Sequence, residues 1–161
     1  MSKDEFRQLR ANLGMSRIEC AKYLGLSSAE DIILFENGTS DIKPEYTKIL
    51  AVLDSKIETA VILEVDLFSQ SAERNVILVR FLTDDEFALY EPEFFDELGS
   101  ASVHGAFVRR TKRAIERIGG EVTVAYMDSE FYQTWLSVND FDDSREIRVT
   151  WVRQQIRGLA K

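Results

Sequence analysis

The stretch Ser16-Arg17-Ile18-Glu19-Cys20-Ala21-Lys22-Tyr23-Leu24-Gly25 decides the fold of the first third of the chain. Ser16 and Glu19 have the spacing of a capping box, in which a hydroxyl and a carboxylate each accept a hydrogen bond from a free amide at a helix start. Gly25 is a favourable residue just beyond a helix end. The spacing predicts a helix over 17–24 whose inward side chains are Ile18, Cys20, Ala21 and Leu24.

Two further capping-box pairs lie on either side of this stretch. They are Ser2 with Glu5 and Ser27 with Glu30, and each precedes a helical pattern of apolar residues. Gly14 suits the end of the first helix, and Asn37-Gly38 suits the end of the third. The sequence therefore predicts helices over about 3–13, 17–24 and 28–37, and a fourth that starts at Pro44.

Together these helices resemble the Cro and phage-repressor (XRE) type of helix-turn-helix. The resemblance rests on Ser16-Arg17-x-x-Cys20-Ala21-x-x-x-Gly25 and Ile32-x-x-x-Glu36-x-Gly38, and it covers residues 3–55. It implies a DNA-binding domain whose third helix reads the major groove. The turn before that helix is one residue longer than is usual in the family. In this respect the chain is similar to anti-CRISPR-associated transcriptional regulators, which implies autorepression.

The third helix departs from the family on its exposed face. Arg, Gln, Ser or Asn are usual there, whereas this chain has the acidic Glu30 and Asp31 and the apolar Ile33 and Leu34. Because phosphates repel carboxylates, the backbone contacts are expected from basic side chains and helix amides, although each basic residue could equally be a solvated charge. The predicted DNA-binding residues are Arg17, Lys22, Ser27, Ser28, Ala29, Asp31, Ile33, Asn37 and Lys43.

A long fourth helix is predicted from Pro44 to about 68, which exceeds what a helix-turn-helix needs. It would serve as a bridge into the second region, as a dimer seam, or as a core helix. The polar segment 69–73 is the best boundary candidate. We therefore predict a helix-turn-helix domain with its long fourth helix at 1–68, and a C-terminal α/β domain at 74–161 that mediates dimerisation.

The C-terminal region alternates strands and helices. Residues 76–82 form an apolar run typical of a strand buried on both faces, and 121–127 form a second strand. The helix predicted over 101–118 makes the crossover long enough for a parallel pair. Pro92 breaks or starts a helix in the acidic stretch before it, and a final helix covers about 144–156. The expected fold is α+β, mostly α, with about two strands.

The helix predicted over 101–118 has two contrasting sides. Its apolar stripe consists of Val103, Phe107, Thr111, Ala114, Ile115 and Ile118. The other side carries Arg109, Arg110, Lys112, Arg113 and Arg117. This basic side is either a secondary nucleic-acid patch or a solvated face that balances nearby acidic groups. If it binds, it would supply charge that the third helix lacks, since the whole chain has a formal charge of −8.

Composition and motifs exclude several functions. No apolar run is long enough to cross a membrane, and the acidic, polar N-terminus does not resemble a secretory signal, so we expect a cytoplasmic protein. One cysteine and one histidine cannot form a Cys/His metal site. His104 is expected to be a surface or capping residue, and Cys20 a small core residue. No catalytic or nucleotide-binding motif is present, so we expect neither enzymatic activity nor a cofactor nor a metal.

These observations lead to two hypotheses. The first is a sequence-specific DNA-binding transcriptional regulator, a repressor and possible autoregulator, which binds a pseudo-palindromic double-stranded operator as a homodimer. The second is a protein-interaction module of the antitoxin or adaptor kind, in which the helix-turn-helix is kept for packing or dimerisation and no longer reads DNA. The acidic third helix and the net charge of −8 favour the second.

Overall fold

The computed structural model describes residues 1–159 and begins with four helices. They are α1 (Lys3–Asn12), α2 (Arg17–Tyr23), α3 (Ala29–Asn37) and α4 (Pro44–Gln70). We call this group the N-terminal bundle. The capping boxes at Ser2 and Ser16 are confirmed, because both the hydroxyl and the carboxylate bonds are formed at each helix start. The bundle closes on the fully buried side chains Phe6, Leu13, Cys20, Ile32, Leu50 and Leu53.

Two details of the predicted bundle are wrong. The third capping box is not formed, because Ser28 has the extended backbone of an N-cap and its Oγ accepts from the amide of Glu30, 3.0 Å away. Ser27 Oγ instead lies 3.5 Å from Asp31 Oδ2. Ile18 is 72% exposed rather than inward. It is two residues from Cys20, and a helix turns by about 200° over two residues, so Ile18 points away from the packed face.

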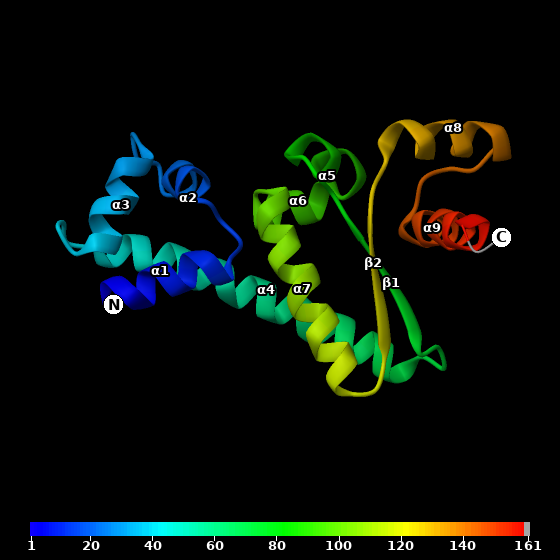
Figure 1. The fold of residues 1–161 in the computed structure, drawn as a ribbon, viewed down its shortest axis with the longest axis horizontal. Coiled ribbons are helices and arrows are strands. Elements are labelled where there is room, and N and C mark those ends of the chain that lie inside the picture. The colour runs from blue at the N-terminus through cyan, green and yellow to red at the C-terminus, as the bar shows by residue number, and fades with distance from the viewer. Residues whose placement is uncertain (160–161) are drawn as a thin grey trace.

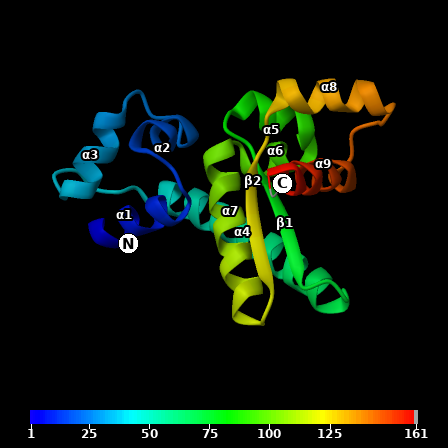
Figure 2. The same cartoon turned by 45° about the vertical axis from the view of Figure 1, so that its right-hand side comes forward.

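The long helix α4 belongs to both halves of the molecule. It begins with Pro44 in its first turn and buries Leu50, Leu53, Ile57, Val61 and Phe68 along one side. It contacts α1 of the N-terminal bundle and α6 (Pro92–Leu98) and, more extensively, α7 (Ala101–Arg117). Figures 1 and 2 both show α4 running from the bundle to the region of the sheet. The predicted boundary at 69–73 lies at the end of this shared helix.

The described part of the C-terminal region contains one two-stranded parallel sheet. The strands are β1 (Asn75–Arg80) and β2 (Glu121–Tyr126), in a register that pairs Leu78 with Val124. As predicted, α7 makes the crossover, and it packs against both strands, while α9 (Arg145–Leu159) contacts β1 (Figure 1). The remaining helices are α5 (Asp84–Tyr90), α6 (Pro92–Leu98) and α8 (Ser129–Asn139). The α+β, mostly α, fold is confirmed.

Burial in the C-terminal region differs from the prediction at three places. Only Leu78 of β1 is buried, because each strand of a two-stranded sheet is an edge. Ile118 is 50% exposed, since it lies beyond the last residue of α7. His104, expected at the surface, is only 4% exposed. The first half of α7 is enclosed on all sides, and the rings of Phe81, Phe87, Phe94 and Phe107 surround the imidazole within 5.8 Å between centroids.

Two kinds of feature are absent from the described residues. Within 1–159 no helix has the length and apolar character needed to cross a membrane. In the same part of the chain, no group of three or more His, Cys, Asp or Glu side chains is placed to hold a metal ion.

Candidate nucleic-acid interface

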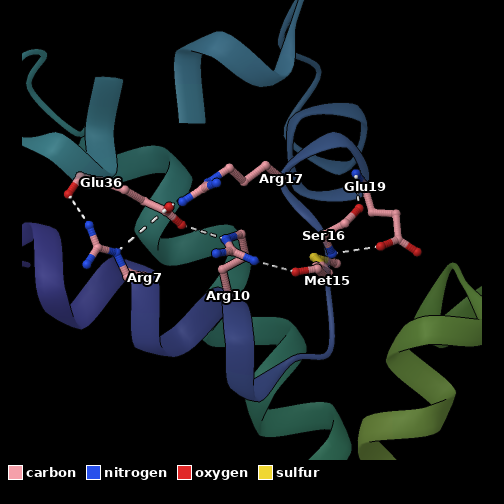
Figure 3. Close-up of polar contacts among 7 residues, drawn as sticks. All are labelled: Arg7, Arg10, Met15, Ser16, Arg17, Glu19 and Glu36. Atoms are coloured by element: carbon pink, nitrogen blue, oxygen red, sulfur yellow. Dashed lines mark hydrogen bonds and ion pairs between the residues drawn. The ribbon is translucent and has the colours of Figure 1, made fainter. Parts of the chain in front are cut away.

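The buried carboxylate of Glu36 holds the first three helices together (Figure 3). It is fully buried on α3, and its two oxygens accept from Arg10 Nε of α1 at 2.6 Å and Arg17 Nε of α2 at 2.8 Å. Arg7 of α1 lies 3.8 Å from the carboxylate and donates from Nη2 to the Glu36 carbonyl at 2.8 Å. We call Glu36 with Arg7, Arg10 and Arg17 the Glu36 cluster.

The electrostatics of this cluster favour the ionised carboxylate. Burial alone would raise the pKa of Glu36, but hydrogen bonds and charges from Arg10 and Arg17 outweigh it and hold the pKa below its usual value. Arg10 also donates to the Met15 carbonyl at 2.6 Å, which secures the turn between α1 and α2. Removing one partner of a buried ion pair leaves the other charge uncompensated. The cluster therefore fixes how α3 is presented.

The Glu36 cluster gives Arg17 a structural role in addition to the predicted phosphate contact. The sequence predicts Arg17 as a phosphate contact, and in the structure its Nε donates a hydrogen bond to the Glu36 carboxylate. The side chain is still 48% exposed, so its outer nitrogens remain accessible. In the sequence, Glu36 stands out only as a position of the Ile32-x-x-x-Glu36-x-Gly38 motif. The signal that could have revealed its role is the presence of Arg7, Arg10 and Arg17 on the neighbouring helices.

The outer face of α3 carries most of the other predicted DNA-binding residues. Ser27, Ser28, Ile33 and Asn37 are exposed, whereas Ala29 and Asp31 are half-buried. No lysine or arginine occurs between Ala29 and Asn37. Figures 1 and 2 both place α3 at the end of the molecule away from the sheet. The face is thus accessible, and its charged groups are acidic.

The two remaining predicted lysines lie on either side of α3. Lys22 is exposed on α2, on the same flank as Ile18. Lys43 precedes α4 and is 64% exposed, with its Nζ 3.9 Å from Glu45 and 5.5 Å from the centre of the Tyr46 ring. Both are available to solvent, and only Lys22 shares a helix with Arg17.

The neighbouring side of α2 contacts the C-terminal region. Glu19 Oε1 accepts from the hydroxyl of Ser102 on α7, and a Cβ added to Gly99 would lie 3.3 Å from the Tyr23 ring. Burial acts to raise the pKa of Glu19, but hydrogen bonds from Ser102 and Ser16 lower it overall. The C-terminal region therefore touches α2 at Glu19 and Tyr23, and Lys22 lines a pocket together with Gly99 and Ser100.

The predicted basic side of α7 is divided into paired and unpaired residues. Arg110 Nη2 lies 2.6 Å from Asp54 of α4, and Lys112 Nζ lies 2.5 Å from Glu116. These two residues are neutralised within the fold. Arg109, Arg113 and Arg117 have no carboxylate within 4.0 Å in the part of the chain that the structure describes. Only these three members of the patch are free to meet an external anion.

The fold defines a mostly helical α+β protein, in which the N-terminal bundle shares the long helix α4 with the region of a small parallel sheet. A family model described as a domain of unknown function, DUF4447, matches residues 1–156. The match spans the N-terminal bundle and nearly all of the C-terminal region, so the chain belongs to the DUF4447 family. The comparison with curated proteins gave no match.

Proposed function

We propose that the chain is a sequence-specific DNA-binding regulator of transcription, in which α3 enters the major groove. The main support for this proposal is the way in which α3 is held on one side and exposed on the other. Its inner side is fixed to α1 and α2 by the Glu36 cluster, and its outer side is open at one end of the molecule. A rigidly held helix with a free outer face is what direct readout of base edges requires.

The proposal assigns different tasks to different side chains. Lys22, Lys43 and the outer nitrogens of Arg17 contact phosphates, which position the protein without reading sequence. Asn37 and the hydroxyls of Ser27 and Ser28 can hydrogen-bond base edges or the backbone, and Ile33, 39% exposed, can contact a thymine methyl. Asp31 is half-buried and favours the positive end of the helix dipole.

A homodimer is the second part of the proposal, and α4 supplies a surface for it. Ile49, Val52, Leu63 and Leu67 are each at least 40% exposed on one side of α4. Their spacing is symmetric about the middle of the helix. An antiparallel pair of α4 helices would bring Ile49 against Leu67 and Val52 against Leu63, and would place the exposed Lys48 near the exposed Asp66 of the second copy. Such self-complementarity is what a two-fold interface needs.

Binding to DNA is tested by gel shifts with duplexes from the region upstream of the chain's own gene, at stated salt concentrations. Lys22→Ala should weaken binding to all sequences by a similar factor and lower the salt slope by about one unit. Asn37→Ala should instead relax sequence preference. Arg157→Ala, which removes one charge from the exposed end of α9, is the matched control. No retardation by folded protein at micromolar concentration contradicts the proposal.

The dimer is tested by light scattering on the eluate of a sizing column. Leu63→Glu places a charge in the proposed seam and should convert dimer to monomer without unfolding the chain, because the side chain is 60% exposed. Leu89→Glu, at a residue that is 63% exposed on α5, serves as the control. A wild-type chain that elutes as a monomer at micromolar concentration argues against this surface.

One observation favours the protein-interaction module as a second candidate. The outer face of α3 combines Glu30 and Asp31 with Ile33 and Leu34, and Ile18 on α2 is 72% exposed. On α3 the apolar residues are bordered by acids and no basic residue is present, which suits a protein partner better than a phosphate backbone. This candidate would be favoured if the chain does not bind DNA and co-purifies with the product of a neighbouring gene. The co-purification should then be lost in the Ile18→Glu variant.

A further inference from the structure

Three arginines gather on one side of the crossover helix without a counter-charge. Arg109 and Arg113 lie one turn apart on α7, and Arg80 is at the end of β1. We call these three residues the arginine cluster. None of them has a carboxylate within 4.0 Å among residues 1–159, although acidic residues outnumber basic ones by 28 to 20 in the chain. An unpaired group of arginines in an acidic protein needs a physical reason.

Arg80 is held in place by its surroundings. Its Nη1 lies 3.1 Å from the hydroxyl of Tyr126, its neighbour in the sheet register, and its guanidinium lies 5.4 Å from the centre of that ring. A Cβ added to Gly105 would come within 2.5 Å of Arg80 Nη2, so the guanidinium rests directly on the helix backbone. Its buried Nε has no hydrogen-bond partner in the described residues.

The cluster is concentrated enough for its charges to oppose one another. Partial burial lowers the pKa of Arg109, and the charges of Arg80, Arg113 and Arg110 lower it further. Gly105, Arg109 and Arg113 follow each other at intervals of four residues, which places them along one side of α7. Arg109 therefore stands between the guanidinium of Arg80 and Arg113. A bound anion would relieve the repulsion among all three.

A groove of about 530 Å³ adjoins the cluster. Arg109, Arg110 and Arg113 form one wall, and Asn12, Asp54 and Glu58 from α1 and α4 form the other. Asp54 already accepts a hydrogen bond from Arg110 at 2.6 Å, and Glu58 lies 3.8 Å from the same guanidinium, so both carboxylates retain free lone pairs. One wall can thus bind phosphate, while the other can accept hydrogen bonds from hydroxyl or amino groups.

We propose that the arginine cluster and this groove form a binding site for a small ligand that carries a diphosphate group, such as a nucleoside diphosphate. Arg80, Arg109 and Arg113 hold the phosphates, because guanidinium groups bind phosphate oxygens through paired hydrogen bonds. The rest of the ligand lies in the groove against Asp54 and Glu58. The site is separate from the outer face of α3 and does not depend on DNA binding.

A small ligand fits these observations better than a DNA backbone. Two carboxylates on the opposite wall would repel a continuous polyanion, whereas they can hydrogen-bond the hydroxyl groups of a sugar. Arg80 is also recessed, since its Nε is buried and its guanidinium is covered by Tyr126 and Gly105.

Isothermal titration of the full chain with pyrophosphate, ADP and adenosine tests the proposal. Pyrophosphate and ADP should each bind with one-to-one stoichiometry, and adenosine alone should not bind. Arg109→Ala and Arg113→Ala should each weaken binding at least about tenfold, because each removes charge-assisted hydrogen bonds. Arg117→Ala is the matched control, since it removes the same side chain from the same helix outside the groove, and it should change affinity less than about twofold.

Gly105→Ala provides a second, independent variant. Alanine favours a helix over glycine, so α7 should remain folded, while the added methyl group displaces the Arg80 guanidinium. We expect weaker pyrophosphate binding without a loss of thermal stability. The proposal is overturned if neither pyrophosphate nor ADP binds. It is also overturned if Arg109→Ala and Arg113→Ala leave the affinity for pyrophosphate unchanged, because the bound group would then be an adventitious ion only. It is also overturned if these variants weaken binding of a DNA duplex while pyrophosphate does not bind.

Discussion

Glu36 is the residue on which the presentation of α3 depends most directly. Its carboxylate is fully buried and lies 2.6 Å from Arg10, which is only 13% exposed. Glu36→Ala leaves the Arg10 charge buried without a partner, so we expect a loss of about 3 kcal/mol in the free energy of unfolding. Urea unfolding measures this loss. Glu30→Ala, at an exposed position on the same helix, should change stability by less than about 0.5 kcal/mol, and equal midpoints for the two variants would contradict the role of the cluster.

The same carboxylate predicts how stability responds to acid. The pKa of Glu36 is lower in the folded chain than its reference value of 4.5. The ion pairs therefore stabilise the fold fully above pH 4.5, and this contribution is lost as pH falls through the folded pKa. Glu36→Gln should be less stable than the wild type at pH 7, and the difference should shrink as the pH is lowered below 4.5. A difference that stays constant with pH would be evidence against this linkage.

His104 offers a second titration, and it is the only histidine in the chain. Burial, together with the charges of Arg145 and Arg80, lowers the pKa of His104 from 6.5 to about 3. The unfolded state binds the proton more tightly, so His104 should cost about 1.4 kcal/mol of stability for each pH unit below 6.5 down to the folded pKa. The ring proton signals of this one histidine in NMR spectra should not titrate between pH 5 and 8. A midpoint near 6.5 would show that the imidazole is solvated.

At the scale of elements, the start of α3 can be tested by a pair of serines. Ser28 is the N-cap and accepts from the Glu30 amide, while Ser27 makes no cap bond. Ser28→Ala should destabilise the chain by about 1 kcal/mol, whereas Ser27→Ala should cost less than about 0.5 kcal/mol. Thermal unfolding of both variants measures the difference. A larger loss of stability in Ser27→Ala than in Ser28→Ala would support the helix start predicted from Ser27 and Glu30.

The elements that sequence predicts well are those with local signals. The capping boxes at Ser2 and Ser16, Pro44 at the start of α4, and the long crossover between parallel strands all depend on neighbouring residues or on connection length. The periodicity of α7 likewise identifies its buried stripe, apart from the half-buried Ala114 and the exposed Ile118. These signals operate within one element, so they do not require knowledge of what packs against it.

The features that sequence did not predict depend on several elements at once. His104 is buried because α5, α6 and Phe81, the residue after β1, bring phenylalanine rings around the first half of α7, which periodicity in α7 cannot reveal. Glu36 is buried because arginines on two other helices neutralise it. Arg80 joins Arg109 and Arg113 only through the parallel pairing of β1 with β2 and the packing of Gly105 on α7. The binding surfaces follow from this tertiary arrangement.

For the whole molecule, the sharing of α4 predicts that both regions unfold together. The buried apolar cluster runs from Phe6 in α1 to Val152 in α9, and α4 packs on both α1 and α7. Trp135 and Trp151 both lie in the C-terminal region, so their fluorescence reports on that region, while far-UV circular dichroism reports on all helices. We expect the two signals to share one urea midpoint, as in a two-state transition.

Glu36→Ala makes this expectation sharper, because the substitution lies in the N-terminal bundle, on a different element from either tryptophan. If α4 couples the regions, the variant should lower the midpoint of tryptophan fluorescence by as much as that of circular dichroism. Coupled unfolding would mean that a ligand bound in the groove between α1, α4 and α7 stabilises the bundle that presents α3. A fluorescence midpoint that stays at the wild-type value would show instead that the regions at 1–68 and 74–161 unfold independently, as separate domains would.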